Sequence, residues 1–333
     1  MIVIVIVIVI VVATGFLAGP TLAQTASQLG ASQPGAFPVR PLKLVVGFTP
    51  GGGVDINARL LAPKLTDLLG QPVIVENRPG AGTNIANELV ASAAPDGYTL
   101  LINTPAVAIN MALYKKLRYD TLRDLTAVSV FSESPNLLVI RSNVAIRDVG
   151  ELLALARSKP GSLNFSSAGA GSTQHLSGEL LKLRTGIDIV HVPYKGSAQS
   201  LTALIAGEVD MTFANIPAIF PHVKSGRIRP LASTGEKRSQ LMADVPTMSE
   251  AGVNGVRVNT WYGVLAPAAT PREIVNTLAA AIAKAAHSPE IRQRLLEQGA
   301  EPIGSTPTEF DRLLRQEITA WREVVEASGA RAD

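Results

Sequence analysis

A short stretch between Leu42 and Asp55 constrains the fold more than any other part of the chain. Branched apolar residues over 42–48 predict a β-strand that stops at Thr49-Pro50. Three glycines follow, and apolar residues then recur at helical spacing, at Val54, Ala58, Leu61, Leu65 and Leu68. Glycines let the main chain approach a ligand closely, and the first N–H groups of a helix have no partner within it. A strand, a bare turn and a helix N-terminus therefore predict a binding site for an anion.

The same alternation of strands and helices continues along the chain and predicts an α/β fold with largely parallel sheets. Strands are expected at 42–48, 73–76, 99–103, 136–140, 163–166, 187–193, 209–214 and 229–234. Helices between them are expected to begin near Asp55, Thr83, Arg147, Thr173 and Ser197. In the last quarter, Thr-Pro-x-Glu sequences at 270–273 and 306–309 predict capping boxes. Ser288-Pro289 predicts a further helix start, and Gly299 is expected to end that helix.

Two later turns share the design of the first. The segment 164–175 is rich in Gly and Ser, follows a predicted strand, and offers Ser172 as the N-cap of the next helix. It lacks the third glycine of a dinucleotide-binding fingerprint and the Gly-Lys-Ser/Thr of a P-loop. The segment 191–197 leaves two alternatives open. In one, the side chains of Tyr194 and Lys195 face a ligand; in the other, Tyr194 packs against the protein and Lys195 is solvated. Because crevices form at the carboxyl ends of parallel strands, these turns are expected to converge on one site.

Composition restricts the classes of protein to consider. The 333 residues are 47% hydrophobic and 17% charged, which is typical of a globular chain with substantial cores. A net charge of +3 without a dense Lys/Arg cluster suits a small anionic ligand and does not indicate nucleic acid as a partner. The absence of cysteine excludes disulfides, thiol catalysis and thiolate metal sites.

No catalytic or metal-binding motif is present. The sequence contains neither a Gly-x-Ser-x-Gly elbow nor a His-Glu-x-x-His zinc motif, and its four histidines show no ligand spacing. We therefore expect no metal, no cofactor and no enzymatic activity. One alternative is a secreted serine hydrolase that uses Ser172 and His175, although spacing identifies no carboxylate to complete a triad.

The N-terminus resembles an export signal. Residues 1–12 are almost entirely Ile and Val, and Thr21-Leu22-Ala23 before Gln24 approximates a small-x-small cleavage pattern. We predict a signal peptide over 1–23, cut after Ala23, a loose leader over 24–37, and export to the periplasm. An uncleaved membrane anchor is the alternative, but the apolar run is shorter than the roughly 20 residues that span a bilayer.

Seven motifs in order resemble those of the Bug (Bordetella uptake gene) family, the TctC-like periplasmic receptors of tripartite tricarboxylate transporters. They are Phe48-x-Pro-Gly-Gly-x-x-Asp55, Asn77-Arg-Pro-Gly-Ala-Gly82, Ala94-Pro-Asp-Gly-Tyr-Thr-Leu100, Ser167-Ala-Gly-x-Gly-Ser172 leading to His175-Leu176, His191-Val-Pro-Tyr-Lys-Gly196, Asp244-Val-Pro-Thr247 with Glu250-Ala-Gly252, and Trp261-Tyr-Gly263. The matches cover nearly all of the chain from Phe37 to Gly329.

This resemblance implies a two-lobed periplasmic-binding-protein fold of type II, a Venus flytrap in which each lobe is a mixed, mostly parallel sheet flanked by helices. Lobe 1 is expected to comprise 38–135 and 262–333, and lobe 2 to comprise 136–261, with crossings near Pro135 and Trp261. The implied function is that of a monomeric receptor that binds a small carboxylate (a di- or tricarboxylate, an amino acid or an aromatic acid) and delivers it to membrane subunits of a tripartite transporter. A receptor that presents its ligand to a signalling kinase is the alternative.

The family also implies which residues hold the ligand, partly through ordered waters. Carried over by position, they are Thr49, Pro50, Gly51, Gly52, Thr104, Ser167, Gly169, Gly171, Ser172, Thr173, His175, Tyr194 and Asn215. The chain departs from the family pattern at Gly47 and Thr49, which stand where Pro and a small apolar residue are usual, and at Met111, which replaces a frequent Pro. The hydroxyl of Thr49 lies at the mouth of the first turn and is expected to influence which solute fits.

Overall fold

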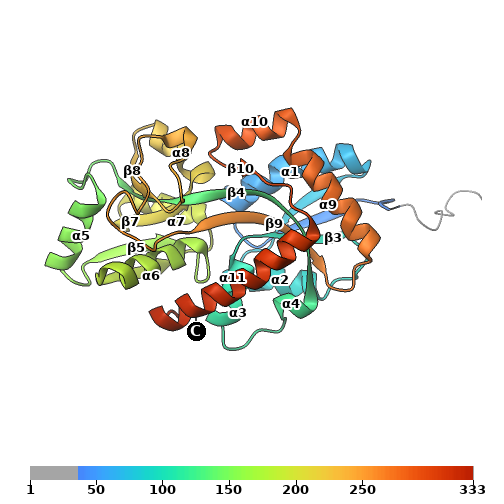
Figure 1. Cartoon of the computed structure of the whole chain (residues 1–333), viewed down its shortest axis with the longest axis horizontal. Coiled ribbons are helices and arrows are strands. Elements are labelled where there is room, and N and C mark those ends of the chain that lie inside the picture. The colour runs from blue at the N-terminus through green and yellow to red at the C-terminus, as the bar shows by residue number, and fades with distance from the viewer. Residues whose placement is uncertain (1–36, 333) are drawn as a thin grey trace, which may run out of the picture. The chain divides into compact units, whose positions relative to one another are not determined.

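The computed structural model describes residues 37–332, so the predicted signal peptide (1–23) and residues 24–36 of the leader lie outside the described residues. The first three strands form one sheet, and each leads into a helix (Figure 1). The strands are β1 (Leu42–Val46), β2 (Val73–Asn77) and β3 (Thr99–Asn103), and the helices are α1 (Gly53–Leu69), α2 (Asn84–Ala91) and α3 (Ala106–Leu113), with a 3₁₀ turn η1 (Ala81–Thr83) before α2. Both β2 and β3 pair with β1 in parallel, as the alternation predicted.

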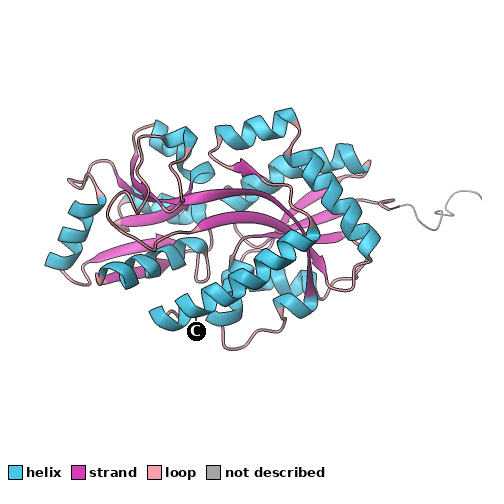
Figure 2. Ribbon diagram, in the orientation of Figure 1, coloured by secondary structure: helices cyan, strands magenta, loops and turns pink. Residues whose placement is uncertain are grey.

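The middle of the chain forms a second sheet in the same way. Strand β5 (Leu163–Ser167) pairs in parallel with β6 (Ile189–Pro193) on one side and β7 (Met211–Asn215) on the other. Helices flank the strands of this sheet (Figure 2). They are α5 (Val149–Ser158), α6 (Thr173–Thr185), α7 (Ser197–Ala206) and α8 (Ile216–Lys224), and β8 (Ile228–Ser233) follows α8. The predicted starts at Thr173 and Ser197 are confirmed.

One long strand, β4 (Leu125–Arg141), belongs to both sheets. Its first part pairs antiparallel with β9 (Asn259–Pro267), which also pairs with β3 of the first sheet. Its last part pairs antiparallel with β7 and β8 of the second sheet. The chain therefore runs between the two sheets twice. The lobe boundaries predicted at 135/136 and 261/262 fall on these two strands and stay a prediction.

The sequence predicted a strand only at 136–140 in this region. The first part of β4, all of β9, and the helices α3 and α8 were not predicted. Two register shifts in the β4–β9 pairing interrupt the alternation of buried and exposed side chains. Buried serines add to the effect: Ser132 Oγ donates to Asn57 Oδ1 at 2.7 Å, and Ser129 Oγ to the Ser305 carbonyl at 2.7 Å. Because these hydroxyls have partners inside the protein, polar residues here do not mark a surface.

The C-terminal quarter is helical, as expected, and returns to the first sheet. It contains α9 (Arg272–Ala286), α10 (Pro289–Glu297) and α11 (Pro307–Ser328), with a short strand β10 (Glu301–Pro302) that pairs with β4. Helix α11 contacts α3, β4 and α6, and so touches elements of both sheets. The ring of its Phe310 meets Trp261 of β9 edge-on, 5.1 Å between centroids. This helix therefore covers the strands that join the sheets.

Of the two predicted capping boxes, one is confirmed and the other is wrong. Thr306 Oγ1 accepts a hydrogen bond from the Glu309 N–H, and the Glu309 carboxylate accepts one from the Thr306 N–H. Helix α9 instead begins at Arg272, because Pro271 has a non-helical ψ of 137°, so Thr270 lies one position too early to cap it. Helix α10 begins directly after Ser288, as predicted, and Gly299 follows its end with φ of 68°.

Candidate functional site

A buried aspartate holds the turn between β1 and α1, and α1 begins at Gly53, two residues before the predicted start. The Asp55 carboxylate, 3% exposed, accepts hydrogen bonds from the Gly51 N–H (3.0 Å), Arg59 Nε (2.9 Å) and Asn77 Nδ2 (2.9 Å). Burial raises the pKa of this carboxyl, but the hydrogen bonds and the charge of Arg59 outweigh burial and lower the pKa below its usual value. The charged carboxylate thereby fixes the turn, in which Gly51 has a φ of 83° that favours glycine.

The N-termini of five helices meet around a small inner cavity of about 10 Å³. Its lining consists of Phe48, Gly52, Gly53, Val54, Thr104, Thr173, Gln174, Ser197, Asn215 and Thr260. The first residues of α1, α6 and α7 belong to this set, Asn215 directly precedes α8, and Thr104 lies two residues before α3. All the lining side chains are uncharged. Because these helices begin beside the cavity, the positive ends of their dipoles lie there, and the cavity is suited to a negative group.

Hydrogen bonds between side chains connect the inner cavity to the strands that join the sheets. Asn215 Nδ2 donates to Asn136 Oδ1 of β4 (2.9 Å) and to Thr260 Oγ1 of β9 (3.1 Å). Thr173 Oγ1 lies 2.6 Å from Thr260 Oγ1, and Gln174 Nε2 donates to Asn215 Oδ1 at 3.2 Å. All five side chains are buried. The lining is therefore held in place before any ligand arrives.

Tyr262 adds a polar atom that the sequence analysis did not assign to the site. Its side chain is fully buried, and its Oη has no hydrogen-bond partner among the described residues. A Cβ on Gly53 would lie 2.7 Å from this Oη and 2.8 Å from Asn215 Oδ1, so only glycine fits at the start of α1. Burial raises the pKa of the Tyr262 phenol, which therefore stays a neutral donor beside the helix N-terminus.

A larger outer cavity of about 220 Å³ adjoins the inner one at Phe48, the one residue that lines both. It lies between the glycine turn that leads into α2 and the turns that follow β5 and β6. Its lining consists of Gly47, Phe48, Gly80, Ala81, Gly82, Thr83, Tyr114, Ala168, Gly169, Ala170, Pro193, Tyr194 and Lys195. Elements of both sheets thus enclose this space.

Glycines allow the turns of the two sheets to touch beside the cavities. A Cβ on Gly196, directly before α7, would lie 2.1 Å from Oγ1 of Thr49 in the turn after β1. A Cβ on Gly171, before α6, would lie 2.1 Å from Asn110 Oδ1 of α3. Both oxygens are buried and lack a hydrogen-bond partner in the part of the chain that the structure describes. These close contacts are therefore steric, and they are possible only because Gly171 and Gly196 have no side chain.

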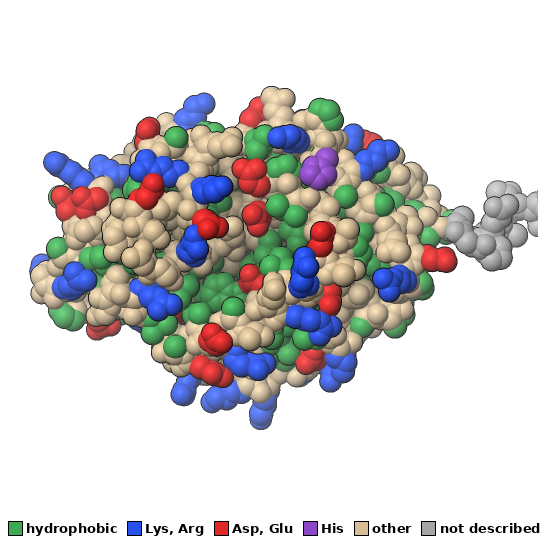
Figure 3. Space-filling model, viewed as in Figure 1, with side chains coloured by type: hydrophobic (Ala, Val, Ile, Leu, Met, Phe, Trp, Pro, Cys, Tyr) green, Lys and Arg blue, Asp and Glu red, His purple; other side chains and the backbone are tan. Residues whose placement is uncertain are grey.

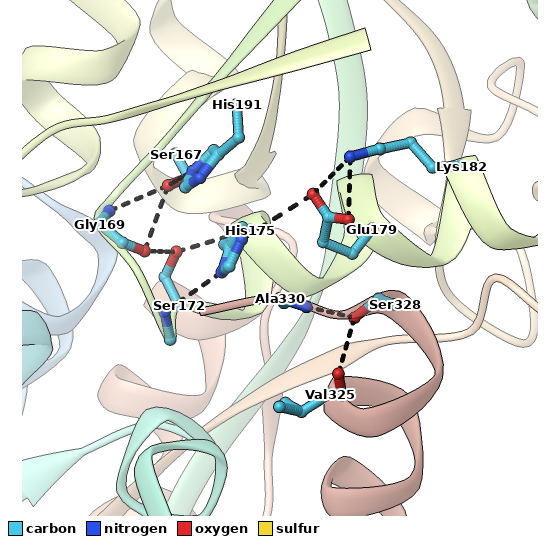
Figure 4. Close-up of polar contacts among 11 residues, drawn as sticks. Ser167, Gly169, Ser172, His175, Glu179, Lys182, His191, Val325, Ser328 and Ala330 are labelled. Atoms are coloured by element: carbon cyan, nitrogen blue, oxygen red, sulfur yellow. Dashed lines mark hydrogen bonds and ion pairs between the residues drawn. The ribbon is translucent and has the colours of Figure 1, made fainter. Parts of the chain in front are cut away.

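Two stacked histidines support the turn before α6. Figure 4 shows His191 of β6 beside His175 of α6, and their rings are 4.0 Å apart between centroids at an angle of 17°. His191 Nε2 lies 2.7 Å from Ser167 Oγ, and His175 Nδ1 accepts a 3.3 Å hydrogen bond from the Gly171 N–H. Burial and the charge of Lys182 lower the pKa of His191 to about 4. Burial, His191 and Lys182 hold the pKa of His175 well below its usual value. Both rings are neutral at neutral pH.

The same contacts do not support a serine hydrolase. Ser172 Oγ donates to the Gly169 carbonyl at 2.7 Å and accepts from the backbone N–H of His175, which makes Ser172 the predicted N-cap of α6. The ring of His175 is directed to the Gly171 N–H and, at 4.0 Å, to the Glu179 carboxylate. Since the imidazole is not bonded to the Ser172 hydroxyl, the pair lacks the geometry of a nucleophile and its base.

The predicted ligand-binding residues fall into three groups. Gly52, Thr104, Thr173 and Asn215 line the inner cavity, and Gly169 and Tyr194 line the outer cavity. The others line neither and instead shape the adjoining turns: Thr49, Pro50, Gly51, Ser167, Gly171, Ser172 and His175. The prediction omitted six residues of the inner lining: Phe48, Gly53, Val54, Gln174, Ser197 and Thr260. Ser197 and Gln174 are recognisable as first-turn residues of expected helices, whereas Thr260 lies on a strand that the sequence did not reveal.

The family described as "Tripartite tricarboxylate transporter family receptor" (TctC) matches residues 57–330. Protein BugT of Bordetella pertussis is 36% identical over 322 residues, which cover 96% of this chain and 95% of BugT. A structure of R. palustris Rpa4515 with adipate is 40% identical with a TM-score of 0.86, covering 89% of this chain and 99% of that one. MatC (Rpa3494) from Rhodopseudomonas palustris with bound malate is 36% identical with a TM-score of 0.83, covering 87% and 100%.

These similarities and the observed sheets define a two-lobed α/β periplasmic binding protein in which helices flank mixed sheets. The chain belongs to the TctC family of tripartite tricarboxylate transporter receptors, which confirms the resemblance to Bug proteins. Members of this family are periplasmic solute-binding receptors and not enzymes. The serine-hydrolase alternative is therefore rejected.

Other kinds of site find no support in residues 37–332. In this range, no group of three or more His, Cys, Asp or Glu side chains could hold a metal ion. None of the helices described in it is long and apolar enough to cross a membrane. On the face drawn in Figure 3, Lys/Arg and Asp/Glu side chains are interspersed. The candidate functional site is the pair of adjoining cavities at which turns of both sheets meet.

Gly196→Ala should destabilise the protein through one contact. The φ of Gly196 is 172°, an extended conformation that alanine adopts, so the strain arises from the approach of the new Cβ to Thr49, above all to its Oγ1 at 2.1 Å. We expect a loss of about 1–3 kcal/mol of unfolding free energy, part of which Thr49→Ala restores because it removes that oxygen. Urea denaturation of the two single variants and the double variant measures the coupling. Additive effects of the two substitutions would contradict the contact.

Stability should fall in acid because both stacked histidines are neutral in the folded protein. Their folded pKa values lie below the unfolded value of 6.5, so the unfolded chain binds more protons as the pH falls from 6.5 toward 4. His191→Gln should reduce this loss by about 2–3 kcal/mol, as measured by urea denaturation across that pH range. His287→Gln, at an exposed position, is the matched control. An unchanged pH slope in His191→Gln would refute the assignment.

Proposed function

We propose that this protein is a periplasmic receptor that binds a small carboxylate between its two lobes and delivers it to the membrane subunits of a tripartite tricarboxylate-type transporter. The observation that carries the proposal is the convergence of five helix N-termini on an inner cavity lined only by uncharged side chains. The bound acids of two similar proteins, adipate in Rpa4515 and malate in MatC, support the same class of ligand.

The physical reason is electrostatic. A helix N-terminus carries about half a positive charge and stabilises a neighbouring anion by about 0.3–1 kcal/mol when exposed, and by up to about 2 kcal/mol when partly buried. Buried dipoles are poorly screened by water and salt, so their effect is largest inside the protein. Since no Asp or Glu lines either cavity, no charged side chain in the lining repels a carboxylate.

The size of the inner cavity indicates where the carboxylate sits. A space of about 10 Å³ holds at most one water molecule. We therefore place the carboxylate at Phe48, where the two cavities adjoin, with a water in the inner cavity linking it to Ser197 and the first turn of α1. Such a bridge is enthalpically nearly as good as a direct hydrogen bond and tolerates acids of different shape. The rest of the ligand occupies the outer cavity.

Closure of the lobes follows from this placement. We propose lobes of 38–135 with 262–333 and of 136–261, which move about β4 and β9. A ligand that contacts the turn after β1 and the turns before α6 and α7 binds the closed form best and shifts the population toward it. Of the predicted residues, we propose Gly52, Thr104, Gly169, Thr173, Tyr194 and Asn215 as lining contacts, while Thr49, Pro50, Gly51, Ser167, Gly171, Ser172 and His175 shape the turns.

The family also suggests the compartment and the partners of this receptor. We propose that residues 1–23 are removed as a signal peptide after Ala23 and that the mature protein acts as a monomer in the periplasm. Its partners are then the small acid and the membrane subunits of the transporter. No cofactor enters this scheme, because the receptor binds its ligand and releases it unchanged.

A carboxylate panel tests the proposal. Thermal-shift measurements would compare aliphatic, hydroxy and aromatic acids with the amide and methyl ester of each acid. At least one acid should raise the melting temperature, whereas its amide and ester should not, because the neutral groups gain little from the helix dipoles. Stabilisation by an uncharged solute with no response to any acid would refute the proposal.

Substitutions in α7 locate the site within the same assay. Ser197→Ala removes a hydroxyl from the inner cavity and should weaken binding of the best acid about threefold to tenfold. Thr202→Ala removes a hydroxyl from an exposed position of the same helix and should leave affinity unchanged. Equal effects of the two variants, measured by isothermal titration calorimetry, would place the acid elsewhere.

A further inference from the structure

Lys195 is the one charged residue in the linings of the two cavities, and it lines the outer one. It belongs to the turn between β6 and α7, its side chain is exposed, and no ion pair joins it to an Asp or Glu within residues 37–332. The carboxylate of Glu208 instead accepts a 3.5 Å hydrogen bond from Oη of the neighbouring Tyr194. The ammonium group of Lys195 therefore remains available to a ligand.

The backbone places Lys195 close to the inner cavity. Its N–H donates to Gln199 Oε1 at 3.2 Å, which fixes the residue at the start of α7. Gly196 then meets Thr49, and Ser197 lines the inner cavity. Because consecutive Cα atoms lie about 3.8 Å apart, the Cα atoms of Lys195 and Ser197 are separated by at most about 7.6 Å. One small molecule can span the two positions.

We propose that Lys195 determines specificity by binding a second negative group of the ligand in the outer cavity, so that the site prefers acids with two negative groups to acids with one. The inference rests on the proposed function, since it takes the first carboxylate to be held by the helix N-termini at Phe48. Those N-termini are neutral donors that serve one carboxylate. A second carboxylate needs its own partner, and Lys195 is the one cation in either lining.

The charge pair gives a measurable preference. It forms in a partly enclosed cavity rather than in bulk solvent, so its contribution exceeds that of a fully exposed pair. We expect a diacid to bind about threefold to tenfold more tightly than its monoamide, which keeps the size and one carboxylate but lacks the second charge. This difference should shrink as salt is added, because the outer cavity is open to ions.

The experiment uses the mature protein with malate, adipate and terephthalate, each beside its monoamide, in isothermal titration calorimetry. In the wild-type protein, the affinity for the diacid that binds best should be about threefold to tenfold higher than the affinity for its monoamide. Lys195→Gln should remove this difference, because it weakens binding of the diacid more than binding of the monoamide. Lys195→Arg keeps the positive charge and should keep the difference. Lys159→Gln removes the same charge from an exposed position after α5 and is the matched control.

The outcomes separate this inference from the proposed function. If diacid and monoamide bind the wild-type protein equally, or if Lys195→Gln weakens both equally, Lys195 does not select for a second charge, although the protein still binds carboxylates. If only monocarboxylic acids bind, the inference is likewise overturned. If no diacid, monoamide or monocarboxylic acid binds, the proposed function itself fails.

Discussion

The convergence of helix N-termini on one uncharged cavity is the constraint on which the rest of the structure depends. It follows from the topology: the parallel strands of each sheet end at one edge, and the helix after each strand begins there. Helices α1 and α3 arrive from the first sheet, and α6, α7 and α8 from the second. The site can therefore attract an anion without an Arg or Lys in its inner lining.

The inner lining is also linked to the strands that join the two sheets. Asn215 and Thr173 reach Asn136 of β4 and Thr260 of β9 through hydrogen bonds of 2.6–3.1 Å between buried side chains. A ligand bound against this lining is therefore linked through hydrogen bonds to the strands about which the proposed lobes move. Asp55 holds the opposite side of the cavity by fixing the glycine turn before α1. Rigid turns on both sides and a shared pair of strands suit a receptor that closes on its ligand.

Local sequence signals predicted the parts of the structure that depend on local chemistry. Apolar runs located β3 at its observed bounds, and Ser172 and Thr306 marked helix starts because their hydroxyls bond backbone N–H groups nearby. The first half of β4 and all of β9 were missed because bulges and buried serines break the period of two, and their partners come from distant elements. For the same reason Thr260 and Tyr262 could not be assigned to the site. The motif residues that line neither cavity show that a turn motif reports backbone shape as much as ligand contact.

A crystal structure of the protein with the acid that stabilises it most would test the proposed site most directly. We expect a carboxylate beside Phe48, hydrogen-bonded directly or through one water to the first turn of α1 and to Ser197, with the rest of the ligand in the outer cavity. A ligand bound outside both cavities, or one that turns an uncharged end toward α1, would contradict it.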